Sequence, residues 1–230
     1  MLEFDEQRLK LAAYESDLAD LSDALGLRAL RSEVEKLEAQ SAQPNFWDDV
    51  DNSHRVLQKI AQSKGKIEAY EKLQSEYDDT MTLIELANEE NDLSFLDEVT
   101  ENVDNIINGI DQLRLTTLLT GEYDANNAIL TFHAGAGGTE AQDWVSMLYR
   151  MYLRYAERKG FKAKTLDILE GDEAGLKSAT VLVEGLNAYG FLKSETGVHR
   201  LVRISPFDAS GRRHTSFASV EVMPEIDDTI

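Results

Sequence analysis

The stretch NAILTFHAGAGGTEAQDWVSMLYRMYLRYAERKG, residues 127–160, decides the fold of the second half of this chain. It begins with a short β-branched and aromatic run at 127–133, which predicts a strand. A glycine cluster follows, and Thr139 with Gln142 three residues later is typical of a capping box that starts a helix. Apolar residues then recur at helical spacing as far as Gly160, a common helix stop. The stretch therefore predicts a strand, a tight glycine corner and one amphipathic helix.

Downstream of this unit, short β-branched runs separated by turn residues continue toward the end of the chain. Such runs predict strands, and with the helix they predict a mixed α/β domain with a mainly antiparallel sheet. The strands predicted in addition to the first are 162–169, 179–184, 187–192, 199–204 and 216–223.

Upstream, the chain changes character, because residues 1–120 contain only 3 of the 14 glycines and hold 27 acidic against 11 basic residues. Apolar residues recur at helical spacing in three segments: one before Pro44, one from near Ser53 and one from near Ser94. These segments predict a bundle of three or four helices with acidic outer faces. The expected fold class is α+β, with an all-helical bundle over 1–120 and the mixed domain over 121–230.

Composition excludes several classes of protein. The chain has 230 residues, of which 42% are hydrophobic and 29% charged, and this balance is typical of a globular protein with a core. It has no cysteine, which excludes a disulfide framework, a thiolate nucleophile and a Cys-based zinc site. The first residues lack the basic start of a signal peptide, and no run of about 18 apolar residues occurs, so we expect a cytoplasmic protein without membrane attachment. The net charge of −20 is the opposite of that expected for a free-standing nucleic-acid binder.

The glycine corner HAGAGGTEAQDW, residues 133–144, is the first candidate site. A dinucleotide fingerprint would need a third glycine where Glu140 stands, and no Gly-Lys-Ser/Thr follows to make a P-loop. Glu140 itself occupies the helix start that an external phosphate would take. Two alternatives remain. The corner either only needs small residues to turn, or it forms a backbone-lined pocket for a small planar polar group.

The second candidate site is a locally basic stretch, ETGVHRLVRISPFDASGRRHTSF, residues 195–217. Its proline and its Ala-Ser-Gly sequence predict an exposed loop at 205–211 between two strands. The loop and its flanks carry hydroxyls that donate and accept, and flat rings that can stack, namely Ser205, Phe207, His214 and Thr215. The arginines expected to meet phosphates are Arg200, Arg203, Arg212 and Arg213. Together these side chains are what a protein needs to read unpaired RNA bases; an ordinary hairpin with a polar loop is the alternative.

A self-contained active site is not expected in this chain. The four histidines show no spacing typical of metal ligands, and the nucleophile-elbow pattern Gly-x-Ser-x-Gly is missing. Adjacent acidic residues point to different sides of a helix and are therefore expected to be solvated charges. We expect no catalytic residue, no metal and no cofactor.

Four motifs carry a family resemblance: GAGGTEAQDW (135–144), ETGVHRLVR (195–203), SPFD (205–208) and GRRHTSF (211–217). In this order they resemble the bacterial peptide chain release factor 2 family of class I translation termination factors, and the likeness covers the whole chain. The Ser-Pro-Phe tripeptide is similar to the one that distinguishes this family from the release factor 1 family, which has a Pro-x-Thr element in the equivalent loop. The resemblance implies recognition of the stop codons UAA and UGA in the ribosomal A site, beside small-subunit rRNA.

The resemblance also implies roles for single residues. The first-position U would be read at the helix tip, and the second purine by Ser205, whose rotatable hydroxyl donates to G or accepts from A. His214 would stack on the codon and separate the third base, which Thr215 would bond, while the apolar Val202 would leave a third-position G poorly satisfied. The complete set implied for codon recognition is Gly137, Glu140, Val202, Ser205, Pro206, Phe207, His214 and Thr215.

Partners and activity follow from the same resemblance. The family releases the finished peptide through a Gly-Gly-Gln loop, a sequence that does not occur in these 230 residues. We therefore expect a monomer that decodes without catalysing hydrolysis, as the N-terminal and decoding part of a longer factor. Residues 1–120 would contact the ribosomal stalk base and the GTPase release factor. The alternative is a helical interaction module that docks on a basic ribosomal or accessory protein without reading codons.

Overall fold

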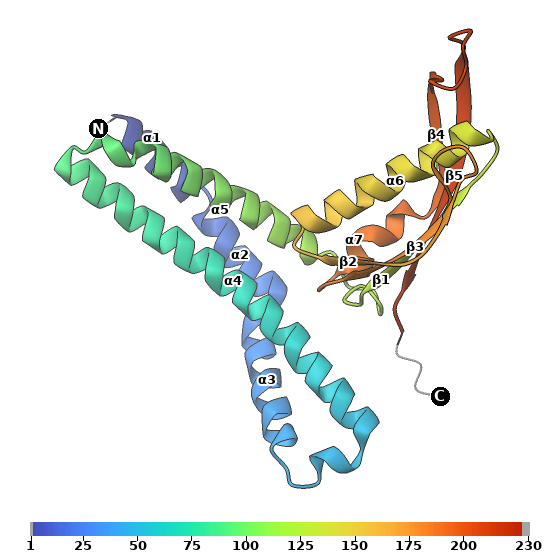
Figure 1. Ribbon diagram of the computed structural model, residues 1–230. Coiled ribbons are helices and arrows are strands. Elements are labelled where there is room, and N and C mark those ends of the chain that lie inside the picture. The colour runs from blue at the N-terminus through green and yellow to red at the C-terminus, as the bar shows by residue number, and fades with distance from the viewer. Residues whose placement is uncertain (1, 227–230) are drawn as a thin grey trace. The chain divides into compact units, whose positions relative to one another are not determined.

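The computed structural model describes residues 2–226, and its internal contacts separate two compact units, 1–118 and 119–230. The first unit is helical, and the second contains one five-stranded sheet with helices (Figure 1). The predicted α+β class, a helical bundle followed by a mixed domain with an antiparallel sheet, is confirmed.

The helical unit contains five α-helices over its described residues, where the sequence predicted three or four. The additional helices lie before Gly26, in a segment whose pattern the sequence analysis did not assign. Gly26 adopts a left-handed φ of +62° and ends one helix, so that the next starts at the following residue. The bounds are Leu2–Ala12 (α1), Glu15–Leu25 (α2), Leu27–Ser41 (α3), Val50–Glu90 (α4) and Leu96–Thr116 (α5).

The long helix α4 begins at Val50 rather than near Ser53. The carboxylate of Asp49 accepts the Asn52 N–H at 3.0 Å and so caps the helix. The Ser53 hydroxyl instead donates back to the Val50 carbonyl at 2.9 Å, which places Ser53 within the first turn. Of the two possible caps, which lie four residues apart, the aspartate is the one that accepts from a free N–H group of the first turn.

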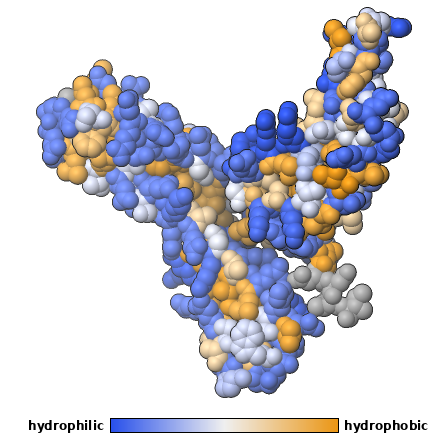
Figure 2. Space-filling view, viewed as in Figure 1, coloured by the Kyte–Doolittle hydropathy of each residue, from blue (hydrophilic) through white to orange (hydrophobic). Residues whose placement is uncertain are grey.

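The core of the helical unit follows the predicted spacing most clearly in α5. Val99, Val103, Ile106 and Ile110 are each at most 1% exposed and lie one turn apart. Each such buried side chain contributes roughly 1.5–3 kcal/mol relative to leaving it in water. Figure 2 shows hydrophilic residues over most of the visible surface of this unit, interrupted by separate hydrophobic patches.

The second unit is built on an antiparallel sheet with the strand order β2-β3-β1-β5-β4. One face of the sheet packs on helix α6, through alternate residues of the central strand such as Leu130 and Phe132. The elements are Ala128–Ala134 (β1), Thr139–Arg158 (α6), Lys162–Glu170 (β2), Leu176–Glu184 (β3), Ala188–Leu192 (α7), Gly197–Ile204 (β4) and Arg213–Pro224 (β5).

The predicted strand at 187–192 is wrong, because this segment forms the short helix α7. Its buried residues Ala188, Gly190 and Leu192 alternate with less buried ones, and over so few residues such alternation does not separate a strand from a helix. Asn187 starts the helix from a left-handed φ of +64°. Gly190 lies so close to the backbone of Asp124 that a Cβ would be 2.9 Å from its carbonyl oxygen. Tertiary packing of this turn decides its conformation.

The start of α6 also differs from the prediction, since Thr139 is the first helical residue and not its cap. Gly138 occupies the cap position at φ +57°, with no side-chain capping bond. The Thr139 hydroxyl donates to Glu173 at 3.1 Å. The predicted capping box therefore does not form. Among residues 2–226, no helix is both long and apolar enough to cross a membrane.

Candidate nucleic-acid interface

The β4–β5 hairpin and the N-terminal end of α6 lie side by side and bring the two candidate motifs together (Figure 1). The Ser205 hydroxyl donates to Glu140 Oε2 at 2.6 Å, across 65 positions of sequence. Both residues are 5% exposed. The glycine corner and the Ser-Pro-Phe loop are therefore two parts of one surface.

Arg203 on β4 connects the hairpin to α6, because its guanidinium donates hydrogen bonds to two carboxylates of that helix. Its Nε donates to Glu140 Oε1 at 2.5 Å, and its Nη2 donates to Asp143 Oδ2 at 2.6 Å. The two acidic residues are three apart and so lie on the same side of the helix. Arg203 was expected to meet phosphate, but its guanidinium faces these carboxylates instead. Its role is therefore revised to holding α6 against β4.

Burial and hydrogen bonding act in opposite directions on Glu140. Burial by itself would raise the pKa of Glu140, but the bonds from Ser205 and Arg203 outweigh it and hold that pKa below its ordinary value. The carboxylate therefore stays charged at neutral pH and acts only as an acceptor. It presents a fixed negative group at the helix tip.

The glycine corner has a structural reason for each of its first two glycines. The Gly135 N–H donates to the Phe217 carbonyl at 2.8 Å, and a Cβ at this position would lie 2.8 Å from the same oxygen. Gly137 adopts a φ of +129°, and a Cβ there would lie 3.1 Å from the Ser216 hydroxyl. The chain thus needs small residues to pass over β5 before it enters α6. This requirement accounts for the glycines and leaves the corner free to contact a ligand as well, since Gly137 is exposed.

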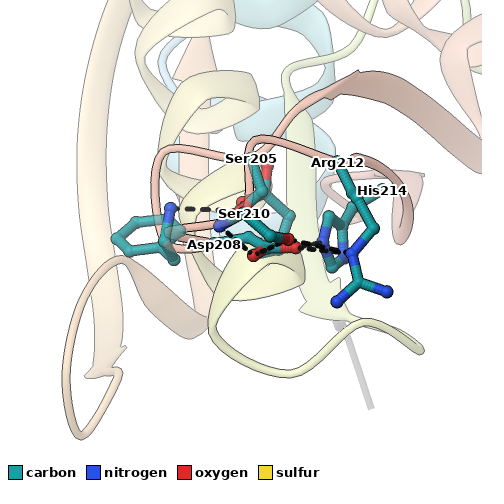
Figure 3. Close-up of polar contacts among 7 residues, drawn as sticks. Ser205, Asp208, Ser210, Arg212 and His214 are labelled. Atoms are coloured by element: carbon teal, nitrogen blue, oxygen red, sulfur yellow. Dashed lines mark hydrogen bonds and ion pairs between the residues drawn. The ribbon is translucent and has the colours of Figure 1, made fainter.

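The loop after β4 is held by side chains of its own sequence (Figure 3). The Phe207 N–H donates to the Ser205 hydroxyl at 3.1 Å. Asp208 accepts from the Ser210 N–H at 2.8 Å and from the Ser210 hydroxyl at 2.5 Å, while its other oxygen lies 2.7 Å from Nε2 of His214. Pro206 is exposed and Phe207 is 49% exposed, so the tip of this ordered loop faces outward.

Strand alternation divides the predicted site residues between the two faces of the hairpin. Arg203 pairs with His214, on the side that contacts α6, here called the α6 face. Val202 pairs with Thr215 on the opposite side, here called the open face. The open face also carries Arg200 and Arg213, both exposed. His214 and Thr215 are adjacent in sequence yet lie on different faces.

The remaining predicted phosphate contact, Arg212, lies in the loop with its side chain 80% exposed. Its Nε donates to the Ser210 hydroxyl at 2.8 Å, which leaves the rest of the guanidinium free to meet other groups. Arg200, Arg212 and Arg213 therefore remain candidates for phosphate contact.

The sequence analysis missed three side chains that contact the predicted site residues or hold their loop: Asp143, Asp208 and Ser210. A signal existed for each of them. Asp143 follows Glu140 by three residues on a predicted helix, which places both on one face. Asp208 and Ser210 form an Asp-x-Ser turn, in which the aspartate commonly bonds the backbone two residues on. Within residues 2–226, no cluster of three or more His, Cys, Asp or Glu side chains is arranged to hold a metal ion.

A model of the PCRF domain matches residues 30–220, which is most of the chain and includes both parts of this junction. The chain belongs to the PCRF domain family. Two curated relatives with the name peptide chain release factor 2 are each 48% identical to it. The protein from Staphylococcus aureus strain MRSA252 aligns over 97% of this chain, and the one from Lactiplantibacillus plantarum aligns over 100%.

Among solved structures, this PCRF-family chain is similar to RF2 of Thermus thermophilus, with a TM-score of 0.51 and 40% identity. That match covers 93% of this chain and 60% of the Thermus chain. The chain also spans 61% of the length of the two curated relatives. The likeness therefore concerns about three fifths of each longer protein.

Proposed function

We propose that this chain is the decoding part of a translation termination factor that reads the stop codons UAA and UGA in the ribosomal A site. The observation that carries the proposal is the buried contact between Ser205 and Glu140, which joins the two motifs into one surface. The 48% identity to proteins with the name peptide chain release factor 2 supports the same assignment. As part of such a factor, the chain would act as a monomer on ribosomes in the cytoplasm.

The first two bases would be read at the α6 face. Gly137 and Glu140 form the helix tip at which a first-position U would be bonded, and a purine there would leave buried polar atoms unpaired. Ser205 would read the second base. Its hydroxyl donates to Glu140 and accepts from the Phe207 N–H. An oxygen has two acceptor sites, so the remaining one can accept from the amino group of adenine, and rotation of the hydroxyl can instead donate to guanine. Both purines are thus tolerated at one hydroxyl.

The third base would be read on the open face. His214 lies on the α6 face of β5, and the following Thr215 points to the other side of the strand. A base that passes the edge of the hairpin would lose its stacking on the second base and meet Thr215 and Val202. A third-position G would find the apolar Val202 where it needs a hydrogen-bond partner. This arrangement supports discrimination against UAG.

Around the codon, Arg200, Arg212 and Arg213 would neutralise phosphates of mRNA and small-subunit rRNA. The chain contains no Gly-Gly-Gln, so we assign it codon recognition and assign peptidyl-tRNA hydrolysis to a region of the full factor outside these residues.

The test is binding to ribosomes programmed with UGA, UAA, UAG or a sense codon in the A site, measured by toeprinting. Wild-type protein should occupy UGA and UAA ribosomes in preference to the other two. Ser205→Ala should weaken binding to UGA and UAA by about fivefold to 150-fold, which corresponds to the cost of about 1–3 kcal/mol for a lost buried polar contact. Ser178→Ala on β3 serves as the matched control, since this strand lies three positions from β4 in the sheet. Equal occupancy of all four ribosomes by the wild-type protein would exclude codon reading.

A second function, protein interaction through the helical unit, is favoured by an exposed apolar patch that consists of Trp47 and Val50. Trp47 is 65% exposed and packs edge-on against the buried Phe46, with ring centroids 5.0 Å apart, and Val50, three residues further along the chain, is 73% exposed. Tryptophan is enriched at the centre of protein interfaces, and the acidic Asp48 and Asp51 around it suit a basic partner. We propose that this patch contacts a basic component at the ribosomal stalk base or the GTPase release factor.

Exchange of the units between this chain and a release factor of the Pro-x-Thr type separates the two functions. Codon preference should travel with 121–230, and binding of the partner protein should travel with 1–120. Codon preference that travels with 1–120 would contradict codon reading by 121–230. Partner binding that travels with 1–120, without any codon preference in 121–230, would favour the interaction module alone.

A further inference from the structure

Asp208 holds its place in the loop through one carboxylate oxygen and touches His214 with the other (Figure 3). Oδ1 accepts both the N–H and the hydroxyl of Ser210, and the Gly211 N–H donates to the Asp208 carbonyl at 3.1 Å. Oδ2 lies 2.7 Å from Nε2 of His214. The loop therefore fixes an acceptor directly opposite one nitrogen of the ring.

We propose that Asp208 is a positioning residue that holds the His214 imidazole, through its Nε2–H, in the orientation that stacks on a nucleobase. The inference rests on the proposed codon reading, because it assigns a function to the ring only within that site.

The proposal follows from the exposure of the ring. The His214 side chain is 45% exposed, and an exposed side chain that must be ordered on binding loses conformational entropy at that moment. A ring that is already held loses less, so binding is stronger without any new contact to the ligand. The other charged groups near the ring are Arg212 in the loop, Arg203 across the hairpin and Glu140 on α6.

The charge state of Asp208 allows it to accept a hydrogen bond from His214 at every pH near neutrality. The hydrogen bonds from Ser210 and His214 lower the pKa of Asp208 to about 2, so the carboxylate is ionised throughout the range in which ribosomes work. A carboxylate only accepts, and Nε2 must therefore carry the proton in this contact. In a neutral ring Nδ1 is then the free acceptor.

A double-mutant cycle distinguishes ring positioning from loop folding. Asp208→Ala should weaken binding to UGA ribosomes by about fivefold to twentyfold, as expected for a partly exposed charged hydrogen bond. His214→Phe keeps a flat ring but removes the N–H, and in that background Asp208→Ala should have no further effect. If Asp208→Ala weakens binding equally in both backgrounds, Asp208 acts on the loop and the inference is overturned.

Ser210→Ala is the matched control, because it removes the hydroxyl bonds to Asp208 and from Arg212 and leaves the contact between Asp208 and His214. It should change UGA binding by less than twofold. A loss as large as that of Asp208→Ala would indicate that only the turn matters.

Nitrogen NMR of the free protein tests the geometry without any ribosome. The wild-type His214 ring should show the proton on Nε2, and Asp208→Ala should give a mixture of tautomers. A wild-type ring with its proton on Nδ1 alone would overturn the inference.

Failure of the proposed function would be recognised by a different result: wild-type protein would then not prefer UGA over sense-codon ribosomes, whatever the NMR shows. If wild-type protein prefers UGA and Asp208→Ala binds as well as wild type, only the positioning inference fails.

Discussion

The two faces of the β4–β5 hairpin share the same strands but differ in how their polar groups are satisfied. On the α6 face, Arg203 and Ser205 both donate to Glu140, and the three side chains are largely removed from water. On the open face, Val202 and Thr215 are exposed. Buried, mutually bonded groups hold a fixed geometry, whereas exposed groups adapt. The difference indicates that the α6 face is preorganised and that the open face is not. In the proposed function the α6 face would read the first two bases and the open face the third.

The largest effect should come from Glu140→Ala, which removes the acceptor shared by Ser205 and Arg203. We expect a loss of about 2–3 kcal/mol in the free energy of unfolding, since one partner of a buried ion pair would be left incompletely matched. Urea unfolding measures this loss. The control is Glu221→Ala on β5, whose side chain is exposed and should change the unfolding energy by less than about 0.5 kcal/mol. Equal effects at both positions would show that the α6 face is not specially ordered.

The next largest effect should come from a substitution in the glycine corner. Gly135→Ala would place a Cβ 2.8 Å from the Phe217 carbonyl oxygen, a backbone atom that cannot move away freely. We expect a cost of about 1–3 kcal/mol in unfolding free energy, typical of overpacking. The adjacent Ala136 is exposed, so Ala136→Ser should be nearly neutral. A neutral Gly135→Ala would contradict the close approach of the corner to β5.

Acid should weaken the α6 face in a defined pH range. The pKa of Glu140 is lower in the folded chain than its ordinary value of 4.5, so its contribution to stability is complete above that value. The contribution is lost as the pH falls through the lower, folded-state pKa. The difference in unfolding free energy between wild type and Glu140→Gln should therefore be constant from pH 5 to 7 and shrink below about 4.5. A difference that grew on acidification would reverse the assigned sign.

On the open face, Val202→Gln should alter codon preference without altering stability. The new amide can bond a third-position G, so binding to UAG ribosomes should rise by about threefold to tenfold, within the range of one exposed hydrogen bond. Val198→Gln, on the same face but four residues away, should leave codon preference unchanged. Toeprints on UAG and UGA ribosomes measure both variants, and an unchanged UAG signal for Val202→Gln would argue against third-base reading on this face.

The smallest effects should come from the exposed arginines. Arg200→Ala and Arg213→Ala should each weaken binding about equally for UGA and UAA ribosomes, and each should reduce the slope of log affinity against log salt by about 1. A codon-specific loss from either variant would mean that the side chain contacts a base rather than a phosphate.

Local sequence patterns predicted much of this molecule. The change in glycine content separated helical from strand-forming regions, and the helical repeat at Val99, Val103 and Ile106 identified core positions. The Ser-Pro-Phe loop was correctly placed between two strands. These features depend on neighbours within a few residues, and such neighbours are visible in the sequence. The same local reasoning failed at 187–192, where six residues are too few to show a period.

The partners of the site residues were beyond local reasoning. Arg203 resembles any exposed strand arginine until α6 is packed against β4, and only then does it face two carboxylates. The sequence likewise did not indicate which hydroxyl group would donate to Glu140. Contacts over about 60 positions depend on how elements pack, and a single sequence does not record this packing.

The sequence alone thus determined the element types, the acidic character of the helical part, the loop that carries Ser205 and the family resemblance, because periodicity, turn chemistry and motif order are local properties. Tertiary structure alone decided that the loop and the helix tip form one surface and that His214 and Thr215 serve opposite faces of the hairpin. It also decided that the guanidinium of Arg203 turns inward. The physical reason is that burial, charge pairing and strand register arise only when segments distant in the chain are brought into contact.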